Sequence, residues 1–412
     1  GEAAWRQEII DFYGDGADEE LFCVPSASSG AWLPGPLIEA RMTAEAPVLR
    51  LELPGDYLHL SRIAQAALMV PFIKELADTV ATLDLSLQYA AGFDFGRVAD
   101  LSTFSLLAVE QRLKRRETLS IEMRNVPGDV AAQHLGTAAW AGHEWQDANY
   151  LWPRAFSDLG HEYERRWGLK YEHLMRIAEI NFTNAKRNPN AQTRTWKFTD
   201  ASFTADNEAN PVVEGMMRKQ DCGQVTDGAA VVFLASPRRA EEYAKKRGIR
   251  LESLPRIKGW GHRSSSISFD QKVRASEGQP YVFPQVRRAI LDARDRAGIK
   301  DISEIHAVET HDCFTTTEYM AIEHLGLTLP GEAWKAIEDD SIAIGGRLPI
   351  NPSGGLIGLG HPVGATGVRM TLDAYKQVTE RAGDYQIDGA RNVQTLNIGG
   401  STTTTVSLLI GT

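Results

Sequence analysis

Apolar residues recur at intervals of three and four positions in several stretches of the chain's second half. Residues 156–167 and 170–186 show this spacing, which is typical of helices with one buried face. We predict further helices over residues 284–297 and 317–325. Apolar runs that fit strands alternate with them, so the fold class is α/β.

Continuous apolar runs predict strands that are covered on both faces of a sheet. Residues 302–310 form one such run. Residues 221–236 and 397–410 share a second plan, in which a glycine turn leads into apolar and β-branched residues. The repeated plan suggests two duplicated halves, each ending on a buried strand.

The first part of the chain follows a less regular pattern. Residues 57–81 and 101–119 are predicted to be helices. A polar stretch rich in Trp and His opens at residues 125–134, and turn clusters at 188–190 and 206–211 mark its end. We therefore expect an insertion between these points.

The length and charge limit the possible functions. A chain of 412 residues is too long for one small core. Its formal net charge of -10 argues against a nucleic-acid partner. No apolar stretch approaches the roughly 18 residues of a membrane span, and the N-terminus lacks a signal-peptide layout. We expect a cytoplasmic protein without a membrane span.

The three cysteines, Cys23, Cys222 and Cys313, are too far apart to match a zinc site or a disulfide framework. We therefore predict no metal. Cys222 is interpreted as a small packed residue beside a turn.

The segment that begins at Asn351 and ends at Arg369 places glycines 354, 355, 358, 360, 364 and 367 around His361. Glycine lets backbone approach backbone or substrate closely. A helix is predicted to begin just after the histidine. His361 is therefore expected on a rigid turn.

This segment resembles the signature of the thiolase superfamily, Asn-x-x-Gly-Gly-x-x-x-x-Gly-His-Pro-x-Gly-x-[Ser/Thr]-Gly. The run His311-Asp-Cys313-Phe314 resembles the sterol-carrier-protein type of thiolase, and so does Asn397-Ile-Gly-Gly400, a turn that carries no cysteine. Acetyl-CoA acetyltransferases of this superfamily share the same plan.

The resemblance implies the thiolase fold, with two duplicated βαβαβαββ halves in a layered α-β-α-β-α arrangement and an inserted loop domain. It implies four segments. These are an N-terminal half over residues 1–122, a loop domain over 123–210, the end of the N-terminal half over 211–248, and a C-terminal half over 249–412.

The resemblance also assigns roles at the site. His361 would deprotonate a nucleophile, Cys313 would act as acid and base toward an enolate, and His311 would position an oxyanion-hole donor. The backbone N–H of Gly399 or Gly400 would complete a second oxyanion hole. Coenzyme A would be substrate and product, with no permanently bound cofactor. Asp312 is expected to cap its loop.

Residues 1–122 depart from the family. Where a nucleophilic cysteine is expected, the chain carries Tyr89-Ala-Ala-Gly-Phe-Asp-Phe-Gly96. Cys23 comes too early in the chain, so the nucleophile is unknown. Three explanations stay open: this half is diverged and catalytically altered, it is replaced, or the sequence read here departs from the natural one. The expected and observed segments have equal length.

The expected function is an acyl-CoA acyltransferase that cleaves or forms 3-oxoacyl-CoA by Claisen chemistry in lipid or steroid side-chain metabolism. One alternative is a thiolase-like lyase that performs retro-aldol cleavage of a bulky CoA thioester. Another is a non-catalytic acyl-CoA-binding subunit. The resemblance implies a homodimer or a dimer of dimers, and it admits a small accessory subunit.

Overall fold

The chain forms two compact units, residues 1–131 and 132–412. The structure is a computed structural model that describes residues 46–57, 60–84, 86–94, 102–109, 115–124, 144–226 and 228–412.

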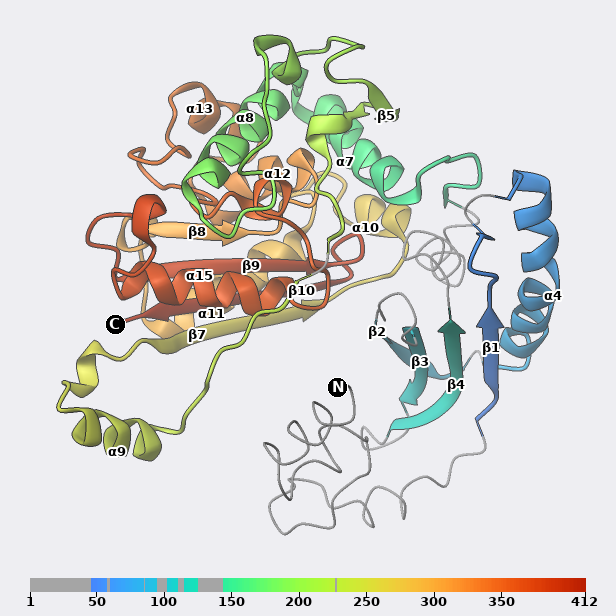
Figure 1. Ribbon diagram of the computed structural model, residues 1–412, viewed down its shortest axis with the longest axis horizontal. Helices are drawn as coiled ribbons and strands as arrows, with labels where there is room; N and C mark the ends of the chain where they lie inside the picture. The colour runs from blue at the N-terminus through green and yellow to red at the C-terminus, as the bar shows by residue number, and fades with distance from the viewer. Residues whose placement is uncertain are drawn as a thin grey trace, which may run out of the picture. The chain divides into compact units, whose positions relative to one another are not determined.

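The first unit contains a four-stranded sheet (Figure 1). Its order is β1-β4-β3-β2, with β1 parallel to β4 and the other neighbours antiparallel. Among the described residues of this unit, the elements are β1 (Val48–Glu52), α4 (Arg62–Val80), β2 (Gln88–Asp94), β3 (Ser102–Val109) and β4 (Arg115–Arg124).

The helix predicted over residues 57–81 is confirmed as α4, which begins at Arg62 after the N-cap Ser61. The helix predicted over residues 101–119 is wrong, because β3 and the start of β4 occupy its described residues. Leu119, Ile121 and Met123 are buried and alternate with more polar positions. This period of two is typical of a strand with one buried face.

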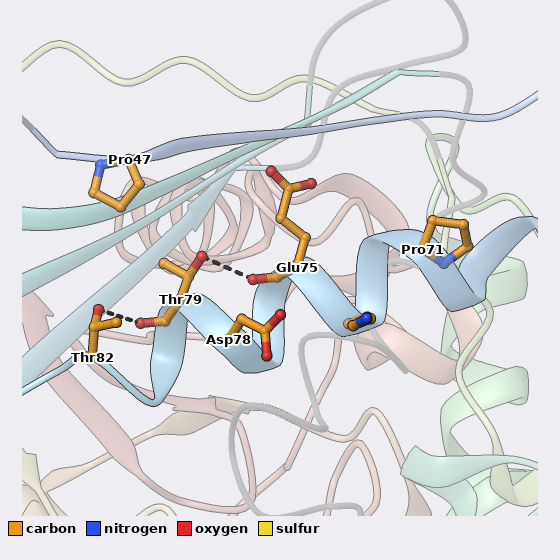
Figure 2. Close-up of a pocket in the computed structure, with 7 residues that line it drawn as sticks. Pro47, Pro71, Glu75, Asp78, Thr79 and Thr82 are labelled. Carbon is orange, nitrogen blue, oxygen red and sulfur yellow. Dashed lines mark hydrogen bonds between the residues drawn. The ribbon is translucent and has the colours of Figure 1, made fainter.

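A shallow hollow of about 590 Å³ lies beside α4 (Figure 2). It is lined by Pro47, by residues of α4 from Pro71 to Thr79, and by Thr82 just after the helix. The hydroxyls of Thr79 and Thr82 donate to helix carbonyls, so they are already satisfied. No histidine or cysteine lines this hollow, and it contains none of the predicted site residues.

The second unit contains the sheet β7-β10-β9-β8, in which β10 is antiparallel to both neighbours and β8 is parallel to β9. In the described part of this unit the strands are β5 (Val212–Glu214), β6 (Met217–Arg218), β7 (Arg256–Ser264), β8 (Ala307–Thr310), β9 (Asn392–Gly399) and β10 (Thr404–Gly411). The helices there are α7 (Leu151–Trp167), α8 (Tyr171–Arg187), α9 (Pro237–Arg247), α10 (Phe269–Ala275), α11 (Pro284–Ala297), α12 (Thr315–Leu325), α13 (Ala333–Glu338), α14 (Gly355–Gly358) and α15 (Thr366–Val378).

Both faces of this sheet are covered by helices. Leu409 of β10 belongs to a core cluster with Ile290 of α11, whereas its neighbour Ile410 packs with Ala374 and Val378 of α15. Because successive side chains of a strand point to opposite faces, α11 and α15 lie on opposite sides. Figure 1 shows α15 along β9 and β10. The motif at His311 and Cys313 follows β8 of this covered sheet, and the turn at Gly400 follows β9.

The helices predicted over residues 156–167, 170–186, 284–297 and 317–325 are confirmed as α7, α8, α11 and α12. The strand predicted over residues 302–310 is shorter, since β8 begins at Ala307 after a single turn of 3₁₀ helix.

The strand predicted over residues 221–236 is wrong for its apolar part. Residues 228–236 form neither helix nor strand, and Val231, Phe233 and Leu234 are exposed. The segment has no neighbouring strand within the described residues to accept its backbone hydrogen bonds.

Candidate active site

His361 lies between α14 and α15, on the turn that the glycines predicted. Its Nδ1 is 2.8 Å from the hydroxyl oxygen of Thr366, and that hydroxyl donates to the carbonyl of Pro362 at 3.2 Å. Since the hydroxyl has one hydrogen, its oxygen accepts from Nδ1–H of the histidine. The Nε2 atom of His361 therefore carries the lone pair and can act as a base.

His311 follows β8, and its backbone N–H donates to the carbonyl of Leu396 in β9. Its ring contacts the ring of His361 edge to face, with centroids 5.1 Å apart. Burial, then Arg369, lowers the pKa of His361 to about 4. Burial and His361 hold the pKa of His311 well below its usual range. Both imidazoles are neutral near pH 7.

Cys313 and His361 lie against the same short segment, residues 222–226. The N–H of Gly223 donates to the carbonyl of Cys313 at 2.8 Å, and the N–H of Thr226 donates to the carbonyl of His361 at 3.1 Å. Because residues 222–226 bind both motifs, the loops of Cys313 and His361 lie next to each other. Burial, then Asp312, raises the pKa of the Cys313 thiol, so the thiol is protonated near pH 7.

Asp312 caps the glycine segment, more than forty residues further along the chain, whereas the sequence predicted a cap of its own loop. Its carboxylate accepts the backbone N–H groups of Leu356 and Ile357 at 2.6 and 3.3 Å, and the amide of Asn181 at 2.9 Å. A Cβ at Gly358 would lie 2.6 Å from the carbonyl oxygen of Asn181. The glycine is needed because α8 passes this close.

Sequence reasoning missed a buried polar network behind the site. The Asn181 amide also donates to Glu318 at 2.7 Å, and Asn351 donates to the same carboxylate at 2.8 Å. Burial, then Asp312, raises the pKa of Glu318 to about 8. The network fixes α8 and α12 against the loop that follows β8. The position of Asn181 in the sequence gives no sign of this role.

Arg369 is a second residue that the sequence reasoning left without a role. Its Nη1 donates to Glu309, Ser353 and Asp373 at 3.2, 2.9 and 3.1 Å. Its Nε and Nη2 are buried without a hydrogen-bond partner among the described residues. The cation helps to keep both site histidines neutral. Arg369 is the last residue of the glycine motif, and this position was the sequence feature that could have pointed to it.

Gly399 and Gly400 form the turn from β9 into β10, where both residues are exposed. A Cβ at Gly367 in α15 would lie 3.4 Å from the side chain of Asn397, two residues before this turn. The helix that follows His361 thus reaches the end of β9.

The two remaining cysteines differ in what the structure says of them. The Sγ of Cys222 donates to the carbonyl of Arg218 at 3.3 Å, and its half-buried thiol fits the packed role expected of it. Cys23 lies outside the described residues. The nucleophile stays unassigned.

Comparisons with known proteins identify the family. Residues 269–412 match the model described as thiolase C-terminal domain-like. An acetyl-CoA acetyltransferase of Methanothermobacter thermautotrophicus is 30% identical over 274 residues, which cover 66% of this chain and 67% of that protein. The chain belongs to the thiolase superfamily.

The sterol-carrier-protein type is also confirmed as a resemblance. Human sterol carrier protein 2 is 30% identical over 256 residues, which cover 62% of this thiolase-superfamily chain. The matched part spans 44% of the human protein's length.

A solved structure named Ltp2-ChsH2(DUF35) aldolase shares the fold. Its TM-score is 0.50 at 21% identity, and the match covers 70% of this chain and 68% of that one. The expected α/β thiolase fold is therefore confirmed. No described helix is both long and apolar enough to cross a membrane.

Proposed function

We propose that this thiolase-superfamily protein is an acyl-CoA acyltransferase that forms or cleaves 3-oxoacyl-CoA thioesters by Claisen chemistry, in lipid or steroid side-chain metabolism. The edge-to-face contact of His311 and His361, beside a segment that also holds Cys313, carries the proposal. Two neutral imidazoles and a protonated thiol are suited to moving protons at neutral pH.

Each group has one task in this proposal. The Nε2 of His361 accepts a proton, either from a thiol nucleophile or from a bound water. Cys313 donates its proton to the α-carbon of the enolate. In the reverse direction the Nε2 of His361 first takes the thiol proton, so that the thiolate can accept the α-proton. His311 and the backbone N–H groups of Gly399 and Gly400 stabilise the negative charge that develops on the thioester oxygen. Coenzyme A is substrate and product.

The proposal also covers the domains of the chain and its assembly into oligomers. Residues 1–122 and 211–248 would form the N-terminal half, residues 123–210 a loop domain that helps to bind coenzyme A, and residues 249–412 the C-terminal half. The protein would work as a homodimer or a dimer of dimers, with a small accessory subunit as a further partner.

Exchange of the α-protons of acetyl-CoA in D₂O tests the proton-transfer step without requiring a cysteine nucleophile. The base removes a proton from the α-carbon, the enolate oxygen is held, and a deuteron returns. We expect mass spectrometry to show protein-dependent deuterium uptake into acetyl-CoA. Absence of uptake, with acetyl-CoA shown to bind by calorimetry, would refute the proposal and favour a binding subunit.

One variant and a matched control test the acid. Cys313→Ala is expected to slow α-proton exchange by about 10²-fold or more, because it removes the proton carrier. Cys222→Ala removes the neighbouring thiol, which is bonded only to a backbone carbonyl among the described contacts. It should leave the rate within about twofold of the unaltered protein.

Retro-aldol cleavage remains the second candidate because it needs a base and an oxyanion hole but no acyl-enzyme. The absence of a cysteine from residues 89–96 favours it. Incubation with a 3-hydroxyacyl-CoA, followed by mass spectrometry for an aldehyde or ketone, separates the two reactions. Release of that carbonyl product without exchange between acyl-CoA and labelled coenzyme A would establish the lyase.

A further inference from the structure

Lys272 of α10 is a buried lysine, with 5% of its surface exposed. Its Nζ donates to the carbonyl oxygen of Ser401, to the Ser401 hydroxyl at 2.7 Å and to the Thr403 hydroxyl at 3.3 Å. Burial lowers the pKa of this ammonium to about 7, against the raising influence of Glu144. An ammonium group has three hydrogens, and here it meets three oxygens.

All three oxygens belong to the turn that joins β9 to β10. The turn has an unusual backbone, since Gly400 has φ of 59° and Thr402 has φ of 67°. The second value is rare for a β-branched residue, and such a conformation persists only where its surroundings hold it. Thr402 is also fully buried.

Neighbouring elements hold this turn at several points. Ser265 donates its hydroxyl to the carbonyl of Thr402 at 3.0 Å and its N–H to the carbonyl of Thr403 at 2.8 Å. Gln285 of α11 donates to the Thr402 hydroxyl at 3.2 Å. Lys272 is the ionisable member of this set, and in its protonated form its hydrogen bonds are the stronger ones.

The anchor itself is fixed by Glu144. The carboxylate of Glu144 accepts the Ser268 hydroxyl at 2.6 Å and the N–H groups of Phe269 and Asp270 at 3.1 and 2.8 Å. These bonds secure the first turn of α10 and therefore the starting point of the Lys272 side chain.

We propose that Lys272 is a positioning residue that holds the backbone N–H groups of Gly399 and Gly400 where they can bind the thioester oxygen. This inference rests on the proposed function, which places an oxyanion hole at this turn. Lys272 does not touch the acyl group. It acts through the 401–403 backbone, which continues directly from the two glycines.

The test compares Lys272→Met with Lys258→Met. Lys258 of β7 donates to Asn392 at 2.8 Å, so it contacts the opposite end of β9 and is the matched control. Hydrogen–deuterium exchange of the peptide covering residues 398–405 should become about tenfold faster in Lys272→Met, and stay unchanged in Lys258→Met.

The chemical readout is the α-proton exchange of acetyl-CoA. In Lys272→Met we expect its kcat to fall about tenfold or more, with KM changed by less than about threefold, because a displaced donor affects the transition state more than binding. A general loss of structure would instead change both, and circular dichroism melting identifies it. Ser401→Ala, which removes one of the three acceptors, should give a smaller change in the same direction.

Unchanged amide exchange at residues 398–405 in Lys272→Met would overturn the inference. A loosened turn with unchanged kcat would also overturn it, because the turn would then not serve the thioester. If the unaltered protein shows no α-proton exchange, the proposed function fails, and amide exchange still decides whether Lys272 holds the turn.

Discussion

Residues 397–410 and 221–236 share one sequence plan but have different structures. In the first, a glycine turn leads into β10, which pairs with β7 and β9 and buries Leu409 completely. In the second, residues 228–236 form no strand, and Phe233 is 96% exposed. An apolar run becomes a strand only where neighbouring strands accept its backbone and other layers cover its side chains.

The two turns also serve different neighbours. The turn before β10 is held by Lys272, Ser265 and Gln285, and it leads into the sheet. The segment 222–226 instead pairs across to Phe314 and His361. The second copy of the plan thus contributes one wall of the candidate site.

The largest expected effect concerns the nucleophile, which the C-terminal motifs do not supply. For the chain as printed, we expect no acyl-cysteine in the region of residues 89–96. Thiolysis of acetoacetyl-CoA should be about 10⁴-fold or more below that of a thiolase with its cysteine, since losing one member of a cooperating set removes most catalysis.

Peptide mapping by mass spectrometry after incubation with an acyl-CoA measures this. An acylated peptide of the Cys-Ala-Ser-Gly kind would show that residues 1–122 of the natural protein differ from those printed. Acylation at Cys23 would show that the earlier cysteine is the nucleophile after all.

The next largest expected effect comes from removing His361, the proposed base. His361→Ala should slow α-proton exchange by about 10²- to 10⁴-fold while the melting temperature stays close to that of the unaltered protein. His262→Ala, at an exposed position of β7, is the control. Near-normal exchange by His361→Ala would remove the histidine from the mechanism.

The two apolar runs are compared directly by truncation. Leu409→Ala should lower the free energy of unfolding by about 2 to 5 kcal/mol, because it opens a cavity in a packed core. Val231→Ala, at a side chain that is 67% exposed, should change it by less than about 0.5 kcal/mol. Chemical denaturation of the full chain measures both. Equal losses would mean that residues 228–236 are buried in solution.

The smallest effect is a pH dependence carried by the polar network beside the site. Burial raises the pKa of Glu318 to about 8, so its stabilising contribution is present at low pH and is lost as the pH rises toward that value. Glu318→Gln keeps an acceptor for Asn181 and Asn351 but cannot ionise.

Between pH 5 and pH 8, Glu318→Gln should therefore gain about 1 kcal/mol or more of stability relative to the unaltered protein. Urea denaturation at the two pH values checks this difference. A constant difference would show that the carboxyl is already ionised at pH 5.

The sequence by itself determined the helices α4, α7, α8, α11 and α12, the alternation of helices and strands in the second half, and the motifs around Cys313 and His361. Periodicity and glycine placement are local properties, and they survive folding because they specify the backbone directly. That Asp312 serves as a cap could be predicted from its residue type, but its partners Leu356 and Ile357 come from a distant segment. The alternation of Leu119, Ile121 and Met123 was also present in the sequence, but the preceding residues 101–119 were predicted to be a helix.

Only the tertiary structure decided which apolar run joins a sheet, which buried groups surround the histidines, and what fixes the turn at Gly400. Asn181 and Glu318 contact the loops that carry Cys313 and His361, and Lys272 contacts the turn after β9, from helices far apart in the chain. The neutral state of His311 follows from burial and from the nearby His361 and Arg369. The burial of a residue, the charged groups near it and the strands that pair with it depend on contacts between segments far apart in the chain. A local sequence pattern does not specify these contacts.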